Sequence, residues 1–302
     1  MQNFRGRTAV ITGAGSGFGL EVARIGAREG MNLVLADVQA DALEHAAAEL
    51  QGQGVAVLAM RVDVSKAAEV EALGHAAFQR FGAPHLVFNN AGVGAGGLIW
   101  ESTVADWEWV LGVNLMGVAH GIRVFTPMML KAAKSDVGYE GHIVNTASMA
   151  GLQNMPNMGV YNVSKHAVVS MSETLHHDLA LVTDQVAASV LCPYFIPTGI
   201  AHSQRNRPAV AGEATISQRV AEAMMTKAVT SAKVSAAEVA QLVFDAVAAK
   251  RFYIYSHPQL LATVQTRLED VIQARNPTDP FAARPEIGEK LRAALRGPAG
   301  AR

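Results

Sequence analysis

The first 200 residues of the chain alternate short apolar runs with longer helical patterns, and this alternation restricts the possible folds more than any other feature. The apolar runs are rich in β-branched and aliphatic residues, as strands covered on both faces usually are. We expect strands at 8–13, 32–37, 54–63, 85–90, 141–148, 186–193 and 251–256. Repeated strand–helix–strand units predict an α/β fold with a doubly wound parallel sheet, the Rossmann arrangement.

Helical periodicity fills most of the chain between these runs. We expect helices at 19–30, 40–51, 66–82, 107–122, 235–250 and 257–275. Residues 199–234 carry no strand pattern, and we expect them to form a helical lid over the substrate side, because long insertions in compact domains are usually functional. No linker or repeat divides the chain, so we expect one domain with a core at 1–256. A C-terminal helix and a surface arm, together 257–302, would belong to it.

Composition excludes several classes of function. The net charge is −1 and no basic stripe occurs, which argues against binding to nucleic acid or to an anionic membrane surface. Cys192 is the only cysteine and the histidines show no ligand spacing, so we expect neither a disulfide nor a metal site. No apolar run reaches membrane-spanning length and no secretory signal is evident, which predicts a soluble cytoplasmic protein.

The stretch TGAGSGFG at 12–19 directly follows the first expected strand and opens the first expected helix. Glycines at such a turn let the backbone approach a pyrophosphate, and the free N–H groups of the helix then face the phosphates. A tight turn alone would need one glycine, whereas four stand within seven positions. The loop therefore predicts dinucleotide binding.

Asp37 ends the second expected strand, eighteen positions after Gly19. A carboxylate there can accept hydrogen bonds from the adenosine ribose, and it would repel the 2′-phosphate of NADP. Positions 15, 16 and 38 are Gly, Ser and Val, so no basic residue at these positions could compensate. We expect NAD to be the cofactor, with a simple turn or capping role for Asp37 as the alternative.

Four polar residues in the middle of the chain suggest a reaction site. Tyr161 and Lys165 are one helical turn apart, Ser148 ends the fifth expected strand, and Asn114 interrupts an apolar helix. Each alone has an ordinary explanation, a surface helix or a satisfied core amide. Together they fit hydride transfer: Tyr161 as the acid–base, Lys165 lowering the pKa of its phenol, and Ser148 bonding the substrate oxygen. Asn114 would hold a water beside Lys165.

The motif order resembles the classical branch of the short-chain dehydrogenase/reductase family over about residues 5–256. The matching features are T-G-x-x-x-G-x-G, Asp37, N-N-A-G at 89–92, Asn114, Ser148, Y-x-x-x-K and a proline after the sixth expected strand. The resemblance implies a nicotinamide cofactor and the catalytic residues Asn114, Ser148, Tyr161 and Lys165. It also implies a homodimer or homotetramer, paired through the helices that carry Asn114 and Tyr161.

The same resemblance implies which residues contact the cofactor. They are Gly13, Ser16, Gly17, Phe18, Gly19, Asp37, Asp63, Val64, Asn90, Ala91, Gly92, Tyr161, Lys165, Pro193, Ile196 and Thr198. Two positions depart from the family pattern. Tyr194 stands where a glycine often follows the proline, and Phe18 replaces an aliphatic residue of the glycine loop.

The expected substrate side is apolar. Besides Ser148 and Tyr161, the candidates are Val93, Leu98, Met149, Met155, Tyr194, Phe195, Met224 and Met225, and packing of the lid on the core explains any one of them equally well. No cluster of basic residues suggests a substrate carboxylate, so we expect a neutral, hydrophobic secondary alcohol or ketone. The alternatives are an NADPH-dependent reductase of the 3-oxoacyl type and, more remotely, a non-catalytic NAD-sensing protein.

Overall fold

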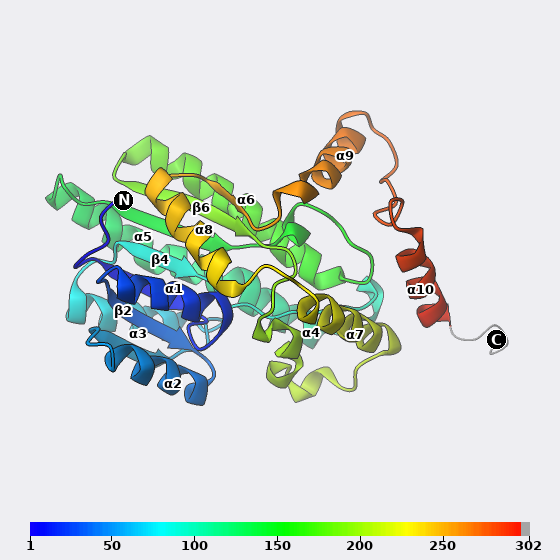
Figure 1. The fold of residues 1–302 in the computed structure, drawn as a ribbon, viewed down its shortest axis with the longest axis horizontal. Helices are drawn as coiled ribbons and strands as arrows, with labels where there is room; N and C mark the ends of the chain where they lie inside the picture. The colour runs from blue at the N-terminus through cyan, green and yellow to red at the C-terminus, as the bar shows by residue number, and fades with distance from the viewer. Residues whose placement is uncertain (297–302) are drawn as a thin grey trace.

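The computed structural model describes residues 1–296, which form a parallel sheet covered by helices on both faces (Figure 1). The strand order is β3-β2-β1-β4-β5-β6-β7, and every neighbouring pair is parallel. The strands are β1 Thr8–Thr12, β2 Asn32–Asp37, β3 Val57–Arg61, β4 Leu86–Asn89, β5 Gly141–Thr146, β6 Val186–Cys192 and β7 Tyr253–Tyr255. All seven expected strands are therefore confirmed, as is the doubly wound fold.

Helices cover the two faces of the sheet in separate groups. Apolar residues of α1, α2 and α8 pack on one face, and those of α3, α5 and α6 pack on the other. The helices are α1 Gly17–Arg28, α2 Ala40–Gln51, α3 Ala67–Phe81, α4 Val104–Leu111, α5 Gly117–Ser135, α6 Gly159–Val182, α7 Ile216–Thr230, α8 Ala236–Ala249, α9 Leu261–Ile272 and α10 Pro285–Arg296. The helix expected at 107–122 runs from α4 into α5 through a π-helical turn, Gly112–Met116.

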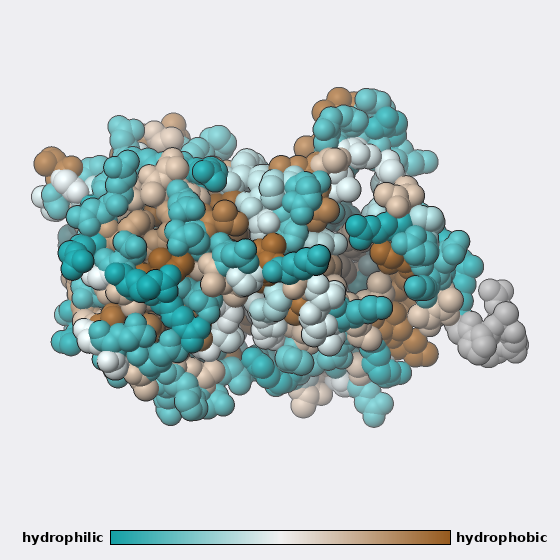
Figure 2. All heavy atoms as spheres, viewed as in Figure 1, coloured by the Kyte–Doolittle hydropathy of each residue, from teal (hydrophilic) through white to brown (hydrophobic). Residues whose placement is uncertain are grey.

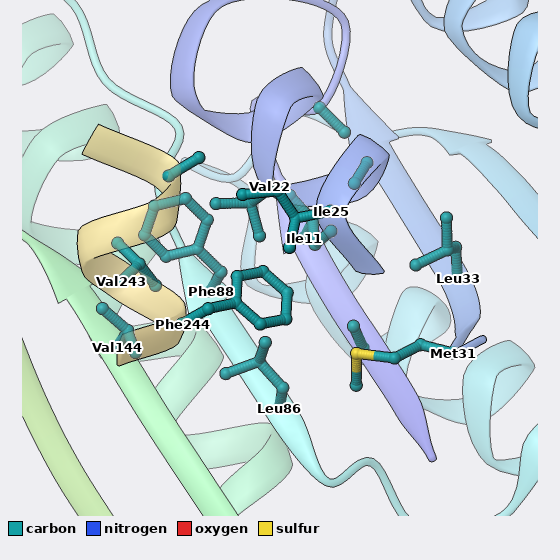
Figure 3. Close-up of a cluster of buried hydrophobic side chains, with 14 of the residues drawn as sticks. Ile11, Val22, Ile25, Met31, Leu33, Leu86, Phe88, Val144, Val243 and Phe244 are labelled. Carbon is teal, nitrogen blue, oxygen red and sulfur yellow. The ribbon is translucent and has the colours of Figure 1, made fainter. Parts of the chain in front are cut away.

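Figure 3 shows the core under α1 and α8, where strand side chains meet the two helices. Phe88 of β4 and Ile11 of β1 are fully buried there, and Phe244 of α8 packs edge-on against Phe4 at 4.9 Å. Each large apolar side chain buried in this way stabilises the fold by about 2 kcal/mol. Burial on both faces explains why the strand sequences are continuously apolar rather than alternating.

Residues 199–234, called the lid below, and the C-terminal arm lie at the end of the molecule away from α2 and α3 (Figure 1). In the same view, hydrophilic and hydrophobic residues are mixed over the surface (Figure 2). The lid consists of two short 3₁₀ helices, Gly199–Asn206 and Ala209–Ala211, followed by α7. The expected last helix is α9, but the arm contains a further helix that the sequence did not predict, α10, which packs against α7. Residues 297–302 of the expected arm lie outside the described residues. Within residues 1–296, no helix has both the length and the apolar character needed to cross a membrane.

Candidate active site

The main cleft opens where β1 and β4 lie side by side and the strand order reverses, the usual ligand position in such sheets. The two strand ends are joined by hydrogen bonds from Asn90, whose backbone N–H donates to Thr12 Oγ1 (2.9 Å) and whose Nδ2 donates to Thr12 O (3.0 Å). A Cβ on Gly13 would lie 2.9 Å from Ala91 Cα, so only glycine permits this approach. The cavity here measures about 670 Å³, a volume typical of a ligand site.

The glycine loop forms one wall of the cleft. Gly13 and Gly17 have φ of 66° and 54°, which glycine adopts without strain. A Cβ on Gly19 would lie 2.1 Å from Gly13 O, so the third glycine of the motif allows α1 to start directly against the loop. The first turn of α1 contains no acidic residue. Its N-terminal N–H groups and dipole therefore favour an anion in the cleft.

Asp37 lies in the cleft lining at the end of β2. Its carboxylate accepts hydrogen bonds from the backbone N–H groups of Gly15 and Gln39, each at 2.9 Å. The side chain is thus held in place beside the glycine loop, where it could also accept bonds from ribose hydroxyls.

The opposite end of the cleft brings Ser148, Tyr161 and Lys165 together. The Ser148 side chain lies close enough to the Tyr161 hydroxyl to lower its pKa, while the Ser148 hydroxyl itself donates to Pro193 O at 3.3 Å. Lys165 Nζ lies 5.7 Å from the centroid of the Tyr161 ring and donates to Thr146 O at 2.9 Å. The helical spacing in α6 and the end of β5 place these groups as the sequence predicts. Their catalytic roles remain predictions.

The acidities of Tyr161 and Lys165 differ from the sequence-based expectation. Burial raises the pKa of Tyr161 to about 12, and the nearby Ser148 side chain only partly opposes this rise. Burial also lowers the pKa of Lys165 to about 8. The expected net lowering of the phenol pKa is wrong for this structure, because the pKa of Tyr161 is raised overall. Tyr161 is only 8% exposed and Lys165 only 3%, so lost hydration outweighs the attraction between the charged forms.

Asn114 is fully buried in the π-helical turn between α4 and α5. Its amide donates to Val93 O (3.0 Å) and Ser164 Oγ (3.1 Å), and its Oδ1 accepts from Val93 N at 2.8 Å. A Cβ on Gly92 would lie 3.4 Å from Asn114 Oδ1 and 3.6 Å from Lys165 Nζ, so Asn114 and Lys165 flank the same glycine. The core-amide explanation therefore holds for Asn114, and its water-holding role stays a prediction. π-Helical turns of this kind are frequent at functional sites.

Most of the predicted cofactor residues line this single cleft. They are Gly13, Ser16, Gly17, Phe18, Asp37, Asp63, Val64, Asn90, Ala91, Gly92, Tyr161, Lys165, Pro193 and Thr198. Gly19 lies behind the loop, and Ile196 is buried in the core under α1 and α8. Of the predicted substrate residues, only Tyr161 is in the cleft lining; Ser148, Met149, Met155, Tyr194 and Phe195 are not. Met149 is packed in the core, and Tyr194 stacks edge-on against Phe195 and His257, so their substrate role stays a prediction.

The other candidates from the sequence are divided between cleft and packing. Val93 lines the cleft, whereas Met225 packs on the loop after β4, where a Cβ on Gly94 would lie 3.0 Å from its sulfur. Met224 is 38% exposed. No group of three or more His, Cys, Asp or Glu side chains within residues 1–296 could hold a metal ion.

Sequence reasoning missed two basic residues in the cleft, Lys66 and Arg205. The sequence argument looked for a basic residue only at positions 15 and 16, in the glycine loop, and at position 38, next to Asp37. Arg205 comes from the lid, whose path over the cleft carries no local sequence signal.

Comparisons with known proteins show the family to which the chain is similar. Residues 7–209 match the family model described as short chain dehydrogenase. A short chain dehydrogenase/reductase from Burkholderia phymatum, solved in complex with NAD, is 53% identical, with a TM-score of 0.89, covering 93% of this chain and 100% of that one. A CLA biosynthesis dehydrogenase/reductase of Lactiplantibacillus plantarum is 32% identical over 277 residues, 90% of this chain and 95% of the relative.

A more distant relative also matches along nearly its whole length. The C alpha-dehydrogenase of a Sphingobium species is 30% identical over 297 residues, 95% of this chain and 93% of the relative. These matches include the glycine loop, the strand ends and α6, which form the cleft. The chain belongs to the short-chain dehydrogenase/reductase family, and it is an oxidoreductase of that kind.

Proposed function

We propose that the protein transfers a hydride between NAD(H) and a neutral, hydrophobic secondary alcohol or ketone, with Tyr161 as the acid–base. The observation that carries this proposal is that Tyr161 and Lys165 line the same cleft as the glycine loop, with the Ser148 side chain close to the Tyr161 hydroxyl. The cleft thus combines a dinucleotide-binding wall with a proton-transfer group.

The residues of the cleft fit a dinucleotide. The glycine loop and the start of α1 would bind the diphosphate, and the Asp37 carboxylate would bind the adenosine ribose. The complex of the relative from Burkholderia phymatum with NAD supports this assignment. Bound NAD would supply the hydride acceptor for alcohol oxidation.

The protein's own side chains would handle the proton. In ketone reduction the Tyr161 hydroxyl donates its proton to the carbonyl oxygen while the carbonyl carbon receives the hydride. In alcohol oxidation the phenolate removes the hydroxyl proton as the hydride leaves. Ser148 donates a hydrogen bond to the same oxygen and stabilises its developing charge. The Lys165 ammonium stabilises the phenolate form, and its pKa of about 8 keeps the lysine mostly charged at neutral pH.

The cleft chemistry supports a neutral substrate. Its lining includes the apolar side chains of Val93, Ala147 and Ile200, from the loop after β4, the end of β5 and the lid. The relatives named for CLA biosynthesis and as a C alpha-dehydrogenase differ in their named roles, so they support the reaction class rather than one substrate.

The test is a spectrophotometric screen of bulky secondary alcohols with NAD, and of the matching ketones with NADH. We expect NAD-dependent turnover, and Tyr161→Phe should reduce it by about 1,000-fold while leaving NAD affinity unchanged. Tyr253→Phe, the same change at an exposed position of β7, serves as the control and should retain full turnover. Near-normal activity of Tyr161→Phe would remove Tyr161 from the mechanism.

Running the same screen with NADP tests the cofactor assignment. The Asp37 carboxylate should disfavour the 2′-phosphate, so we expect turnover with NAD to exceed that with NADP. A clear preference for NADPH would instead support a biosynthetic reductase of the 3-oxoacyl type.

A further inference from the structure

The first half of the lid crosses the cleft and is attached on both sides. On the glycine-loop side, Thr198 Cβ lies 3.2 Å from where a Cβ on Gly17 would be, and the Asn206 side chain accepts a hydrogen bond from Gln39, just beyond β2. On the α4 side, Arg207 forms an ion pair with Asp106 at 2.7 Å. Residue 205 is therefore held above the cleft by its neighbours in sequence.

Arg205 lines the cleft beside the glycine loop. Its Nη2 atom and the Ser16 Oγ atom each lie 3.6 Å from the position that a Cβ on Gly199 would take, so the guanidinium and the loop hydroxyl flank the same point of the cleft wall. Within the described residues, no carboxylate pairs with Arg205 and no acceptor bonds its guanidinium, whereas Arg207, two positions later, is fully engaged. Arg205 therefore presents an uncompensated positive charge to the cleft.

We propose that Arg205 binds the diphosphate of the dinucleotide from the lid side, opposite the N-terminus of α1; this inference rests on the proposed function. The glycine loop, residues 13–19, contains no Lys or Arg, so only neutral N–H groups and hydroxyls face the phosphates from below. A guanidinium can donate two parallel hydrogen bonds to phosphate oxygens, which suits a diphosphate enclosed between loop and lid. Because Arg205 belongs to the lid, its bonds to the diphosphate would also hold the lid over the bound dinucleotide.

The geometry favours the diphosphate over a 2′-phosphate. Asp37 is held on the ribose side of the loop by Gly15 and Gln39, where its charge would repel a 2′-phosphate. Arg205 Nη2 and Ser16 Oγ instead both lie near Gly199, next to Thr198 in the chain. The two anions have the same chemistry, so the experiment must distinguish them.

The test measures the dissociation constants of NAD, NADP, ADP and adenosine by isothermal titration calorimetry on the full chain. We expect Arg205→Gln to weaken NAD and ADP about tenfold, as the loss of a hydrogen bond to a charged group does, and to leave adenosine unchanged. Arg205→Lys, which keeps the charge without the planar fork, should give a smaller loss. Arg219→Gln is the matched control, because Arg219 is an exposed lid arginine outside the cleft lining, and its NAD affinity should stay within twofold of wild type.

Other results would overturn the inference. NAD affinity of Arg205→Gln within twofold of wild type would exclude a phosphate contact, and an equal loss of adenosine affinity would mean that Arg205 acts only through the lid's fold. A loss confined to NADP would assign Arg205 to the 2′-phosphate. Failure of the wild-type protein to bind either dinucleotide would instead contradict the proposed function.

Discussion

The carboxyl edge of the sheet and the lid enclose the same cleft, but they are held by different forces. At the edge, Gly13, Asp37 and Asn90 are positioned by backbone hydrogen bonds and close backbone contacts at the ends of buried parallel strands. The lid is held mainly by side chains, above all the Arg207–Asp106 pair. The edge therefore depends on glycines and strand register, whereas the lid depends on individual polar residues.

This difference predicts two separate modes of failure. Substitutions at the edge should weaken cofactor binding without releasing a segment of the chain, because the sheet anchors every residue there. Disturbing the lid should release a segment while the sheet stays folded, because local regions open independently when few contacts hold them. Three variants test this contrast, from the largest expected effect to the smallest.

Asp106→Asn should have the largest effect and should act on the lid. Asp106 is 6% exposed and accepts two bonds from Arg207, together with bonds from Thr103 and Gln218. The amide leaves the Arg207 guanidinium, 9% exposed, without its counter-charge, which costs about 4 kcal/mol. Hydrogen–deuterium exchange should therefore rise over residues 199–234 and stay unchanged in β1, β4 and β5.

The exposed Asp178 of α6 provides the control, since Asp178→Asn should leave lid exchange unaltered. Unchanged exchange in Asp106→Asn itself would show that the ion pair does not hold the lid.

The stabilisation by the Asp106–Arg207 pair depends on pH in a definite direction. Burial alone would raise the pKa of Asp106, but bonds from Arg207 and Thr103 lower it below 3.8 overall. The stabilisation is therefore complete above pH 3.8 and is lost as the pH falls through the lower folded-state pKa.

Gly19→Ala should have the next largest effect and should act on the edge. The new Cβ would lie 2.1 Å from Gly13 O, so the loop or α1 must shift. We expect this shift to cost about 3 kcal/mol, divided between the free energy of unfolding and the free energy of NAD binding. Gly26→Ala in the same helix is the matched control, because its Cβ would meet only the side chains of Leu33 and Met31. Denaturant titrations and NAD calorimetry on both variants measure the two contributions. If Gly19→Ala bound NAD normally, close contact at the loop would not control binding.

The edge was predictable from sequence because its signals are local. Continuous apolar runs predict buried parallel strands, and the carboxyl ends of such strands meet at one edge, so Gly13, Asp37, Asn90 and Ser148 could be assigned to a common site. The i, i+4 spacing of Tyr161 and Lys165 likewise specifies a shared helix face. Seven strands and the main cleft followed from these patterns.

The lid was not predictable at the level of residues, because its contacts join segments far apart in the chain. Nothing near Arg207 indicates Asp106 as its partner, and nothing near Arg205 indicates the glycine loop. Helix α10 was missed because the packing that supports it comes from α7, far away in the chain. The pKa of Tyr161 was predicted with the wrong sign because spacing reveals a neighbour's charge but not the depth of burial.

Lys165→Met should have the smallest effect and the opposite sign, an increase in stability at the edge. Burial lowers the pKa of Lys165 from 10.5 to about 8, so the charged lysine destabilises the folded state below pH 8. Removal of the charge stabilises the folded state, and loss of the hydrogen bond to Thr146 O partly offsets this gain. The free energy of unfolding at pH 7 should therefore rise by about 2 kcal/mol. Denaturant titrations should show this gain shrinking between pH 8 and 10.5, because the unfolded state binds more protons there and wild-type stability rises. Lys131→Met, on the exposed side of α5, should show no such gain, and a destabilised Lys165→Met would mean that the lysine contributes to the fold as well as to the proposed chemistry.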